Sequence, residues 1–203
     1  MSRGFVRGTL WLEIADGGPA RSTRDVGVKG SSLPVRARAH TRRMRLEISL
    51  PVEIRPLRDG DLDGLEWDSQ QAIQADYVRR TLAERGDDVV FLVALANAQP
   101  VGVLGLDFGR KAEKGIVHLW AFGVLPSLQR LGIGTAMMRA AESLIVAAPR
   151  GANAVEVGVD EWNQDAAKLY RRLGYRDHGT ERGANDELIL LLRRSIAEIQ
   201  EAR

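Results

Sequence analysis

The residues with the clearest chemical potential form a short segment that contains two glycines and reads Gln129-Arg130-Leu131-Gly132-Ile133-Gly134-Thr135. Glycine has no Cβ, so the backbone at Gly132 and Gly134 can approach a ligand closely and leave its N–H groups accessible. If a helix begins here, its N-terminus carries roughly half a positive charge, and a diphosphate is a suitable ligand for it. A tight strand-to-helix turn that binds nothing is the alternative interpretation.

The flanking sequence supplies the two elements that this segment needs. His118 to Pro126 is an apolar run with the length of a buried strand. From Ile133 to Ala148 apolar residues recur at the spacing of a helix with one buried face, and Pro149 and Gly151 end the pattern. The glycine spacing is neither that of a P-loop nor that of a Gly-x-Gly-x-x-Gly loop.

A second segment, from Asn163 to Tyr175, combines a helical pattern with polar groups. Its apolar positions fall near one helix face, and Gly174 has the position of a C-terminal residue in the left-handed conformation. Judged by residue type alone, Asn163 is a helix N-cap and Tyr170 is a core tyrosine. A role in ligand binding or catalysis is the other interpretation of both residues.

Together the two segments resemble the signature motifs of the GNAT superfamily of N-acetyltransferases. The first motif, Gln/Arg-x-x-Gly-x-Gly/Ala, is matched by Gln129, Gly132 and Gly134. The second motif, Asn-x-x-Ala-x-x-x-Tyr-x-x-x-Gly-Phe/Tyr, is matched by Asn163, Ala166, Tyr170, Gly174 and Tyr175. The resemblance covers residues 51–192 and implies an α/β fold with a mixed, mostly antiparallel sheet, splayed central strands and flanking helices.

The resemblance also implies a role for individual residues. The diphosphate of acetyl-coenzyme A would be bound by the first motif, which comprises Gln129, Arg130, Leu131, Gly132, Ile133, Gly134 and Thr135. Phe122, Gly123 and Val124 would offer backbone groups to the pantetheine arm, and we expect Gly123 to form a β-bulge that opens the sheet. The Asn163 amide would meet the coenzyme arm or a neighbouring strand, and Ala166 would belong to the coenzyme site. Leu131 stands where many members of the family have a polar or basic residue.

Two proton transfers are needed for acetyl transfer to an amine. The resemblance implies that Tyr170 protonates the departing thiolate, but this transfer runs uphill by about 2 kcal/mol for ordinary tyrosine and thiol pKa values, so losing Tyr170 should slow the enzyme rather than abolish it. An acceptor amine of pKa about 10.4 is neutral only about once in 2,500 at pH 7, so a general base is also needed. His118 is the first candidate for this base, Asp107 and Glu156 are others, and a purely structural histidine is the alternative.

Composition excludes several classes of protein. The chain has no cysteine, so disulfides and thiol catalysis are excluded, and we expect no metal site. Its apolar runs are shorter than the roughly 18 residues needed to cross a membrane, and we find no secretory signal, so a cytoplasmic location is the default expectation. Residues 1–50 hold 10 Lys and Arg against 4 Asp and Glu, whereas the remainder is mildly acidic. The alkaline pI is therefore no indication of nucleic-acid binding by the domain.

Three parts are predicted along the chain. Residues 1–50 form a basic, flexible N-terminal extension, residues 51–192 form the acetyltransferase domain, and residues 193–203 form a tail or short helix. Met44 opens a segment that continues directly into the domain, so translation starting there, with residues 1–43 outside the native protein, is a further hypothesis. The predicted elements of the domain are strands at 52–56, 89–96, 101–108, 118–124, 154–159, 175–181 and 187–192 and helices at about 69–85, 133–148 and 163–173.

Substrate selection is expected from residues 59–88, where acidic and aromatic side chains would suit a cationic amine; an ordinary solvated helix face is the alternative. The leading hypothesis is an N-acetyltransferase that moves acetyl from acetyl-coenzyme A to a primary amine of a small molecule, peptide or protein by direct transfer. A non-catalytic acetyl-coenzyme A sensor and an enzyme for longer acyl chains are the alternatives. Homodimerisation stays open, since dimers are frequent in the family.

Overall fold

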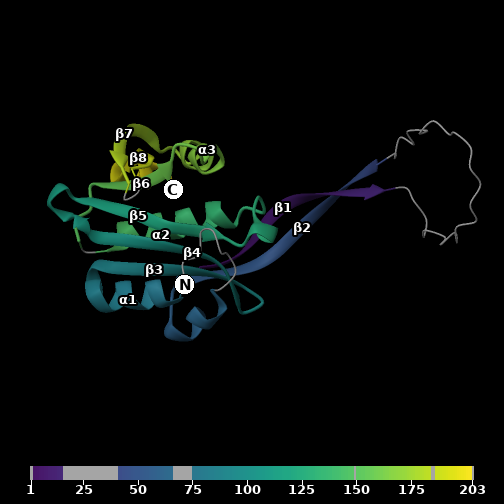
Figure 1. Ribbon diagram of the computed structural model, residues 1–203, viewed down its shortest axis with the longest axis horizontal. Helices are drawn as coiled ribbons and strands as arrows, with labels where there is room; N and C mark the ends of the chain where they lie inside the picture. The colour runs from purple at the N-terminus through teal and green to yellow at the C-terminus, as the bar shows by residue number, and fades with distance from the viewer. Residues whose placement is uncertain (1, 16–40, 66–74, 149, 184–185, 203) are drawn as a thin grey trace, which may run out of the picture.

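A computed structural model describes residues 2–15, 41–65, 75–148, 150–183 and 186–202 of the chain. Its strands form one sheet in the order β1-β2-β3-β4-β5-β6-β8-β7 (Figure 1). The strands are β1 (Ser2–Ala15), β2 (Thr41–Pro56), β3 (Val89–Ala96), β4 (Gln99–Lys111), β5 (Ile116–Val124), β6 (Ala154–Asp160), β7 (Arg176–Arg182) and β8 (Leu188–Ser195). The helices are α1 (Ala75–Arg85), α2 (Ile133–Ala147), α3 (Gln164–Arg172) and α4 (Ile196–Glu201), with short 3₁₀ turns that include η1 (Asp59–Gly64).

The sheet is mixed and mostly antiparallel, as the sequence predicted. Among the described strands, β5 and β6 form the parallel pair, and the other neighbouring strands are antiparallel. The predicted hairpin of β3 and β4 is confirmed, because the two strands form an antiparallel pair along the length of β3. The C-terminal residues, for which a tail or a short helix was expected, form the end of β8 and the short helix α4.

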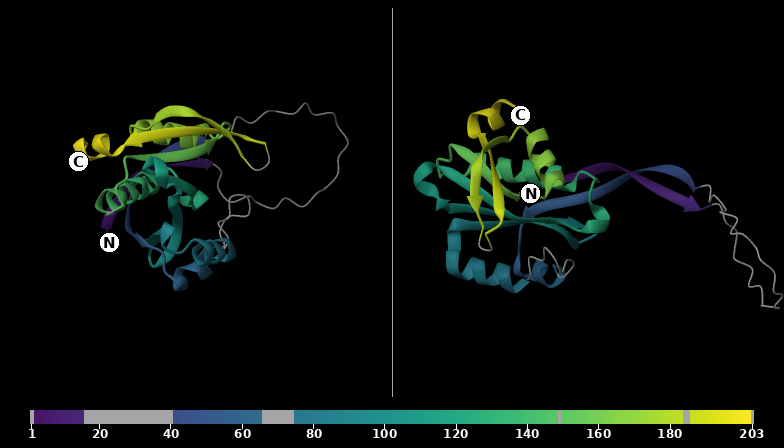
Figure 2. Two further views of the ribbon diagram at one scale, coloured as in Figure 1. Left: turned by 90° about the vertical axis from the view of Figure 1, so that its left-hand side faces the viewer. Right: turned by 45° about the horizontal axis from the view of Figure 1, so that its top comes forward.

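Helices cover the central strands from both faces, which explains the continuous apolar runs of β3 and β4. On one face Val78 of α1 and Leu62 of η1 pack with Phe91 and Val103. On the other face α2 packs against a larger cluster that includes Leu92 and Leu104. Figure 2 shows α1 and α2 on opposite sides of the central strands, with β6, β7, β8 and α3 at the far end of the sheet.

The sheet begins earlier in the chain than residue 51, the predicted start of the domain. β1 pairs with β2 from Ser2↔Ile54 to Ala15↔Thr41, and Figure 1 shows this hairpin projecting beyond the rest of the sheet. Val6 is buried within the main core. The alternation at Leu10, Leu12 and Ile14, which by sequence ends at the following glycines, therefore belongs to a strand of the sheet.

The central strands separate at one point. Pairing between β5 and β6 runs from Ile116↔Ala154 to Leu119↔Val157, while β5 continues to Val124 and β6 to Asp160. Beyond Leu119 the two strands are thus free to diverge, as the splayed-strand prediction requires. A bulge lies next to this point, but its position differs from the predicted one.

The predicted bulge at Gly123 is wrong. Gly123 pairs normally with Val103, and Gly105 pairs with Trp120, so two residues of β5, Ala121 and Phe122, lie opposite one residue of β4. Ala121 has a φ of 51°, the left-handed conformation that the extra residue requires. Glycine favours this conformation, but tertiary packing imposes it here on an alanine.

The predicted helix at 69–85 is described from Ala75 to Arg85. The first part of this predicted helix, residues 69–74, lies outside the described residues. Within the described part of the chain, none of the helices is both long and apolar enough to span a bilayer.

Candidate active site

A cavity of about 910 Å³ opens where β5 and β6 separate. Its walls come from the last part of β5, the start of α2, the end of β6 and one face of α3. Nearly every residue that the sequence singled out lines it: His118, Phe122, Gly123, Val124, Gln129, Arg130, Gly132, Ile133, Gly134, Thr135, Asn163, Ala166 and Tyr170. Two motifs that are far apart in the sequence therefore meet around one space.

The N-terminus of α2 reaches this cavity without a capping side chain. Gly132 is the N-cap residue and has a φ of 88°, which glycine adopts readily. The helical hydrogen-bond pattern begins with the Ala136 amide, which donates to the Gly132 carbonyl at 3.0 Å. The amides of residues 133–135 precede that bond, so they are the orphan donors of the helix and a suitable cradle for an anion.

The remaining residues of the first motif have different surroundings. The Gln129 Nε2 atom donates to the Val124 carbonyl at 3.0 Å, so this side chain fixes the loop to the end of β5. Arg130 pairs with Asp165 of α3 at 2.7 Å, and both side chains are largely exposed. Leu131 is buried and does not line the cavity. A contribution of Leu131 to binding is therefore restricted to its backbone.

On the opposite wall, α3 presents both expected and unexpected residues. Asn163 is the N-cap, and its side chain accepts a hydrogen bond from the Ala166 amide at 3.2 Å. Lys168 and Arg172 also line the cavity and were not predicted. Their i, i+4 spacing places them on one side of α3, and only the position of α3 beside the cavity brings them to it.

Tyr170 lies deep in the same wall. Its side chain is buried beside Phe122, with ring centroids 6.4 Å apart, and beside Tyr175, with centroids 6.3 Å apart. Burial raises the pKa of the Tyr170 hydroxyl above its ordinary value. The phenol is consequently protonated at any physiological pH and is available as a hydrogen-bond donor.

The three candidate bases lie side by side on adjacent strands. His118 of β5 is directly opposite Asp107 of β4 and Glu156 of β6. Asp107 accepts hydrogen bonds from Arg85 at 2.8 Å and from the amides of residues 109 and 110 at 2.9 and 2.8 Å. These three donors leave the Asp107 carboxylate engaged in an ion pair and two backbone hydrogen bonds.

Glu156 also lies among cationic partners. It is fully buried and contacts Lys111 and Arg193, the latter at 2.6 Å. Burial acts to raise the pKa of the Glu156 carboxyl, but His118, Lys111 and Arg193 together lower it below its ordinary value. The His118 Nδ1 atom lies 3.5 Å from Glu156 Oε1 and has no hydrogen-bond partner in the described chain. Of the three candidates, His118 alone is outside a close ion pair.

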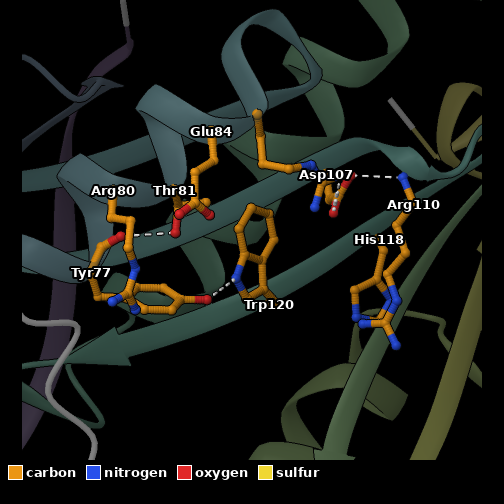
Figure 3. Close-up of a pocket in the computed structure, with 9 residues that line it drawn as sticks. Tyr77, Arg80, Thr81, Glu84, Asp107, Arg110, His118 and Trp120 are labelled. Atoms are coloured by element: carbon orange, nitrogen blue, oxygen red, sulfur yellow. Dashed lines mark hydrogen bonds and ion pairs between the residues drawn. The ribbon is translucent and has the colours of Figure 1, made fainter.

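A second cavity, of about 500 Å³, lies between α1 and the strands β4 and β5 (Figure 3). His118, Trp120 and Arg110 line both cavities, so the two spaces meet at β5. Trp120 lies flat against β4 because residue 105 is glycine; a Cβ there would approach the indole ring to 2.8 Å. The geometry provides one space that contains the uncapped start of α2, a neighbouring space beside α1, and His118 in the lining of both.

Comparisons with known proteins agree with this geometry. Residues 56–175 match the family model described as "Acetyltransferase (GNAT) family". An acetyltransferase of the GNAT family from Streptococcus pneumoniae is 18% identical and covers 71% of this chain and 99% of its own, with a TM-score of 0.57. Ard1 from Thermoplasma volcanium is 16% identical over 71% of this chain and 97% of its own, with a TM-score of 0.60.

Arabidopsis thaliana NAA60, solved in complex with acetyl-CoA, is 18% identical and covers 72% of this chain and 99% of its own, with a TM-score of 0.59. At these identities the solved structures establish the fold. The family model, however, spans more than half of the 203 residues and includes both sequence motifs. The chain therefore belongs to the GNAT family of acetyltransferases, in which acetyl transfer from acetyl-coenzyme A is general.

Proposed function

We propose that this protein is an N-acetyltransferase that moves the acetyl group of acetyl-coenzyme A to a primary amine by direct transfer within a ternary complex. The observation that carries the proposal is the separation of β5 from β6, which opens a cavity between the uncapped end of α2 and Tyr170. The adjoining cavity beside α1 supplies room for the amine.

The residues around the larger cavity fit a molecule with a diphosphate and an extended amide-containing arm. The amides of residues 133–135 would hold the diphosphate, and Lys168 and Arg172 would add positive charge. The open edge of β5 from Phe122 to Val124 would pair with the amides of the arm in the manner of an added strand. Asn163 would act mainly by fixing the start of α3, because its side-chain oxygen already accepts a helix amide.

When bound, acetyl-coenzyme A supplies an activated thioester carbonyl. His118 would take a proton from the acceptor ammonium, after which the amine nitrogen forms a bond to the carbonyl carbon and the carbon–sulfur bond breaks. The anionic Glu156 favours a proton on His118 Nδ1, which leaves Nε2 as the acceptor. Tyr170 would donate its hydroxyl proton toward the leaving sulfur, as a hydrogen bond or as a transfer. The nitrogen loses a second proton as the amide forms, and this proton balances the one that the thiol gains. The absence of cysteine from the chain supports direct transfer.

Measuring thiol release against a panel of amines tests this proposal, with acetyl-coenzyme A binding measured in parallel by calorimetry. We expect binding, release of one thiol per acetylated amine and a matching mass increase of the amine. Binding without turnover on every amine would instead indicate a sensor. A preference for a longer acyl donor over acetyl-coenzyme A would reassign the enzyme to another acyl chain.

A further inference from the structure

One face of α1 forms a wall of the smaller cavity. Tyr77, Arg80, Thr81 and Glu84 follow the i, i+3, i+4, i+7 spacing of a single helix face, and all four line the cavity. Figure 3 shows them opposite Trp120, with His118 and Asp107 at the end of the cavity toward which α1 runs. This face is thus placed to select the acceptor.

The charged side chains of this wall differ in what they already bind. Arg85 is paired with Asp107 at 2.8 Å, and Arg110 is paired with Glu181 at 3.1 Å. Within the described part of the chain, the side chains of Arg80 and Glu84 have no ion pair and no hydrogen bond. They are separated by about 6 Å along the helix axis, the rise of four residues. A free cation and a free anion therefore face the cavity one turn apart.

The neighbouring acidic residues do not create a site for a polycation. Arg79, on another side of α1, contacts three carboxylates, those of Asp59, Asp63 and Asp76. Asp61 forms a bidentate pair with Arg55 at 2.7 and 2.8 Å. None of these four carboxylates lines the smaller cavity, so they do not present their negative charge to an acceptor bound there.

Aromatic side chains form a further part of the wall of this cavity. The Trp120 Nε1 atom donates to the Tyr77 hydroxyl at 3.1 Å, which ties the two rings together. Phe91 supports Trp120 from behind, with ring centroids 5.2 Å apart. This surface suits a short hydrocarbon chain.

We propose that the acceptor is a small amine that carries a carboxylate at its other end. Glu84 attracts the ammonium group toward His118, Arg80 binds the carboxylate, and the Tyr77–Trp120 surface covers the carbon chain between them. The inference deepens the proposed function and rests on it. It assigns Arg80 and Glu84 as the residues that determine acceptor specificity.

Three probe amines of similar length test the inference directly: γ-aminobutyrate, butylamine and putrescine, which end in an anion, a methyl group and a cation. Steady-state thiol release gives kcat/KM for each. We expect γ-aminobutyrate to exceed butylamine by about tenfold, as one charge-assisted contact provides, and putrescine to be the poorest of the three.

Variants of α1 separate the contribution of Arg80 from general effects. Arg80→Ala should lower kcat/KM for γ-aminobutyrate about tenfold and leave that for butylamine within about twofold, while Arg80→Glu should make putrescine the best substrate. Arg79→Ala is the matched control on the neighbouring residue and should keep the order of the three amines. Equal rates for the three amines, a preference for putrescine in the unaltered protein, or turnover of peptide amines alone would overturn the inference and leave acetyl transfer intact. Absence of acetyl-coenzyme A binding, or of turnover with any amine, would overturn the proposed function as well.

Discussion

At the scale of single residues, the account depends on two side chains that flank the transferred acetyl group. Tyr170 is buried beside Phe122 and lines the larger cavity. Its raised pKa makes complete proton transfer to a thiolate less favourable than for an exposed tyrosine. A hydrogen bond to the leaving sulfur is therefore the main contribution that we expect from it.

The first prediction follows for Tyr170→Phe. The phenyl ring keeps the packing, so the free energy of unfolding and the affinity for acetyl-coenzyme A should change little. The value of kcat should fall about 10- to 100-fold, at or below the lower end of the range for general acid catalysis. Steady-state thiol release and calorimetric titration measure the two effects, and an unaltered kcat would show that Tyr170 is only a core residue.

The second prediction concerns His118→Gln. At pH 7 kcat/KM should fall about 100-fold or more, because most of the amine is protonated and lacks its base. As the pH rises toward about 10 the amine loses its proton unaided, so the gap between the variant and the unaltered enzyme should narrow. A pH profile of both enzymes measures this.

His178→Gln provides the matched control, since His178 lies exposed on β7 and lines neither cavity. It should leave the profile unchanged. A constant gap between His118→Gln and the unaltered enzyme across the whole pH range would indicate a structural histidine instead.

The sequence could predict the site residues that belong to local motifs. Gly132 belongs to one short motif, and Asn163 and Tyr170 belong to the other. The spacing of residues within each motif is therefore enough to identify them. Arg80 and Lys168 lie on helices whose position beside the cavities depends on distant packing, and no spacing marks them. In the sequence, Asp107, His118 and Glu156 are three separate candidates. The strand register that places them in one row is set by contacts over long sequence separations, so the sequence does not reveal it.

At the scale of elements, the proposed binding of acetyl-coenzyme A depends most on the start of α2. A side chain with a negative charge at Gly132 would lie beside the orphan amides and oppose a bound diphosphate. We predict that Gly132→Asp abolishes acetyl-coenzyme A binding in a calorimetric titration. Unchanged affinity would contradict the assignment of the cradle.

Two controls separate charge from backbone strain. Gly132→Asn has nearly the same size and tolerates a positive φ but carries no charge, so it should bind more tightly than Gly132→Asp. Gly151→Asp places the same residue at another glycine of positive φ, 62°, with open space around it. It should keep the affinity of the unaltered protein.

Most elements of residues 51–192 could be predicted from periodicity and glycine or proline signals. The bulge could not be predicted in this way. It lies at Ala121 and Phe122, where tertiary packing rather than a glycine residue imposes the left-handed backbone conformation. The separation of β5 from β6 was expected only through the family resemblance, because strand sequences do not record where pairing stops.

At the scale of the whole molecule, the eight-stranded sheet joins segments that the sequence left apart. The pairing of β1 with β2 could not be anticipated, since a basic segment of low apolar content separates the two strands in the sequence. Burial of apolar side chains on both faces of the sheet stabilises the strands and helices that line the two cavities.

The global stability should respond to acid through Asp61. The Arg55 guanidinium beside Asp61 lowers the pKa of that carboxyl against the opposing effect of burial. A lowered folded-state pKa contributes stability that is complete above the unfolded-state pKa of about 3.9 and is lost as the pH falls through the folded-state value. Asp61→Asn should therefore reduce the free energy of unfolding by about 1–3 kcal/mol at pH 7.

Denaturant titrations should show this difference narrowing below about pH 4, where the Asp61 carboxylate begins to bind a proton in the unfolded state before it does so in the folded state. Asp63→Asn is the control, because the Asp63 carboxylate is exposed and pairs with a partly exposed Arg79. Its effect should stay within about 0.5 kcal/mol at all pH values. A pH-independent loss in Asp61→Asn would contradict the ion-pair assignment.

Amide NMR during titration with acetyl-coenzyme A shows which backbone groups the coenzyme contacts. We expect the largest shifts on the amides of residues 133–135, at the start of α2, and on residues 122–124 of β5. Shifts that leave the start of α2 unchanged, or that gather on the β1–β2 hairpin, would contradict this expectation.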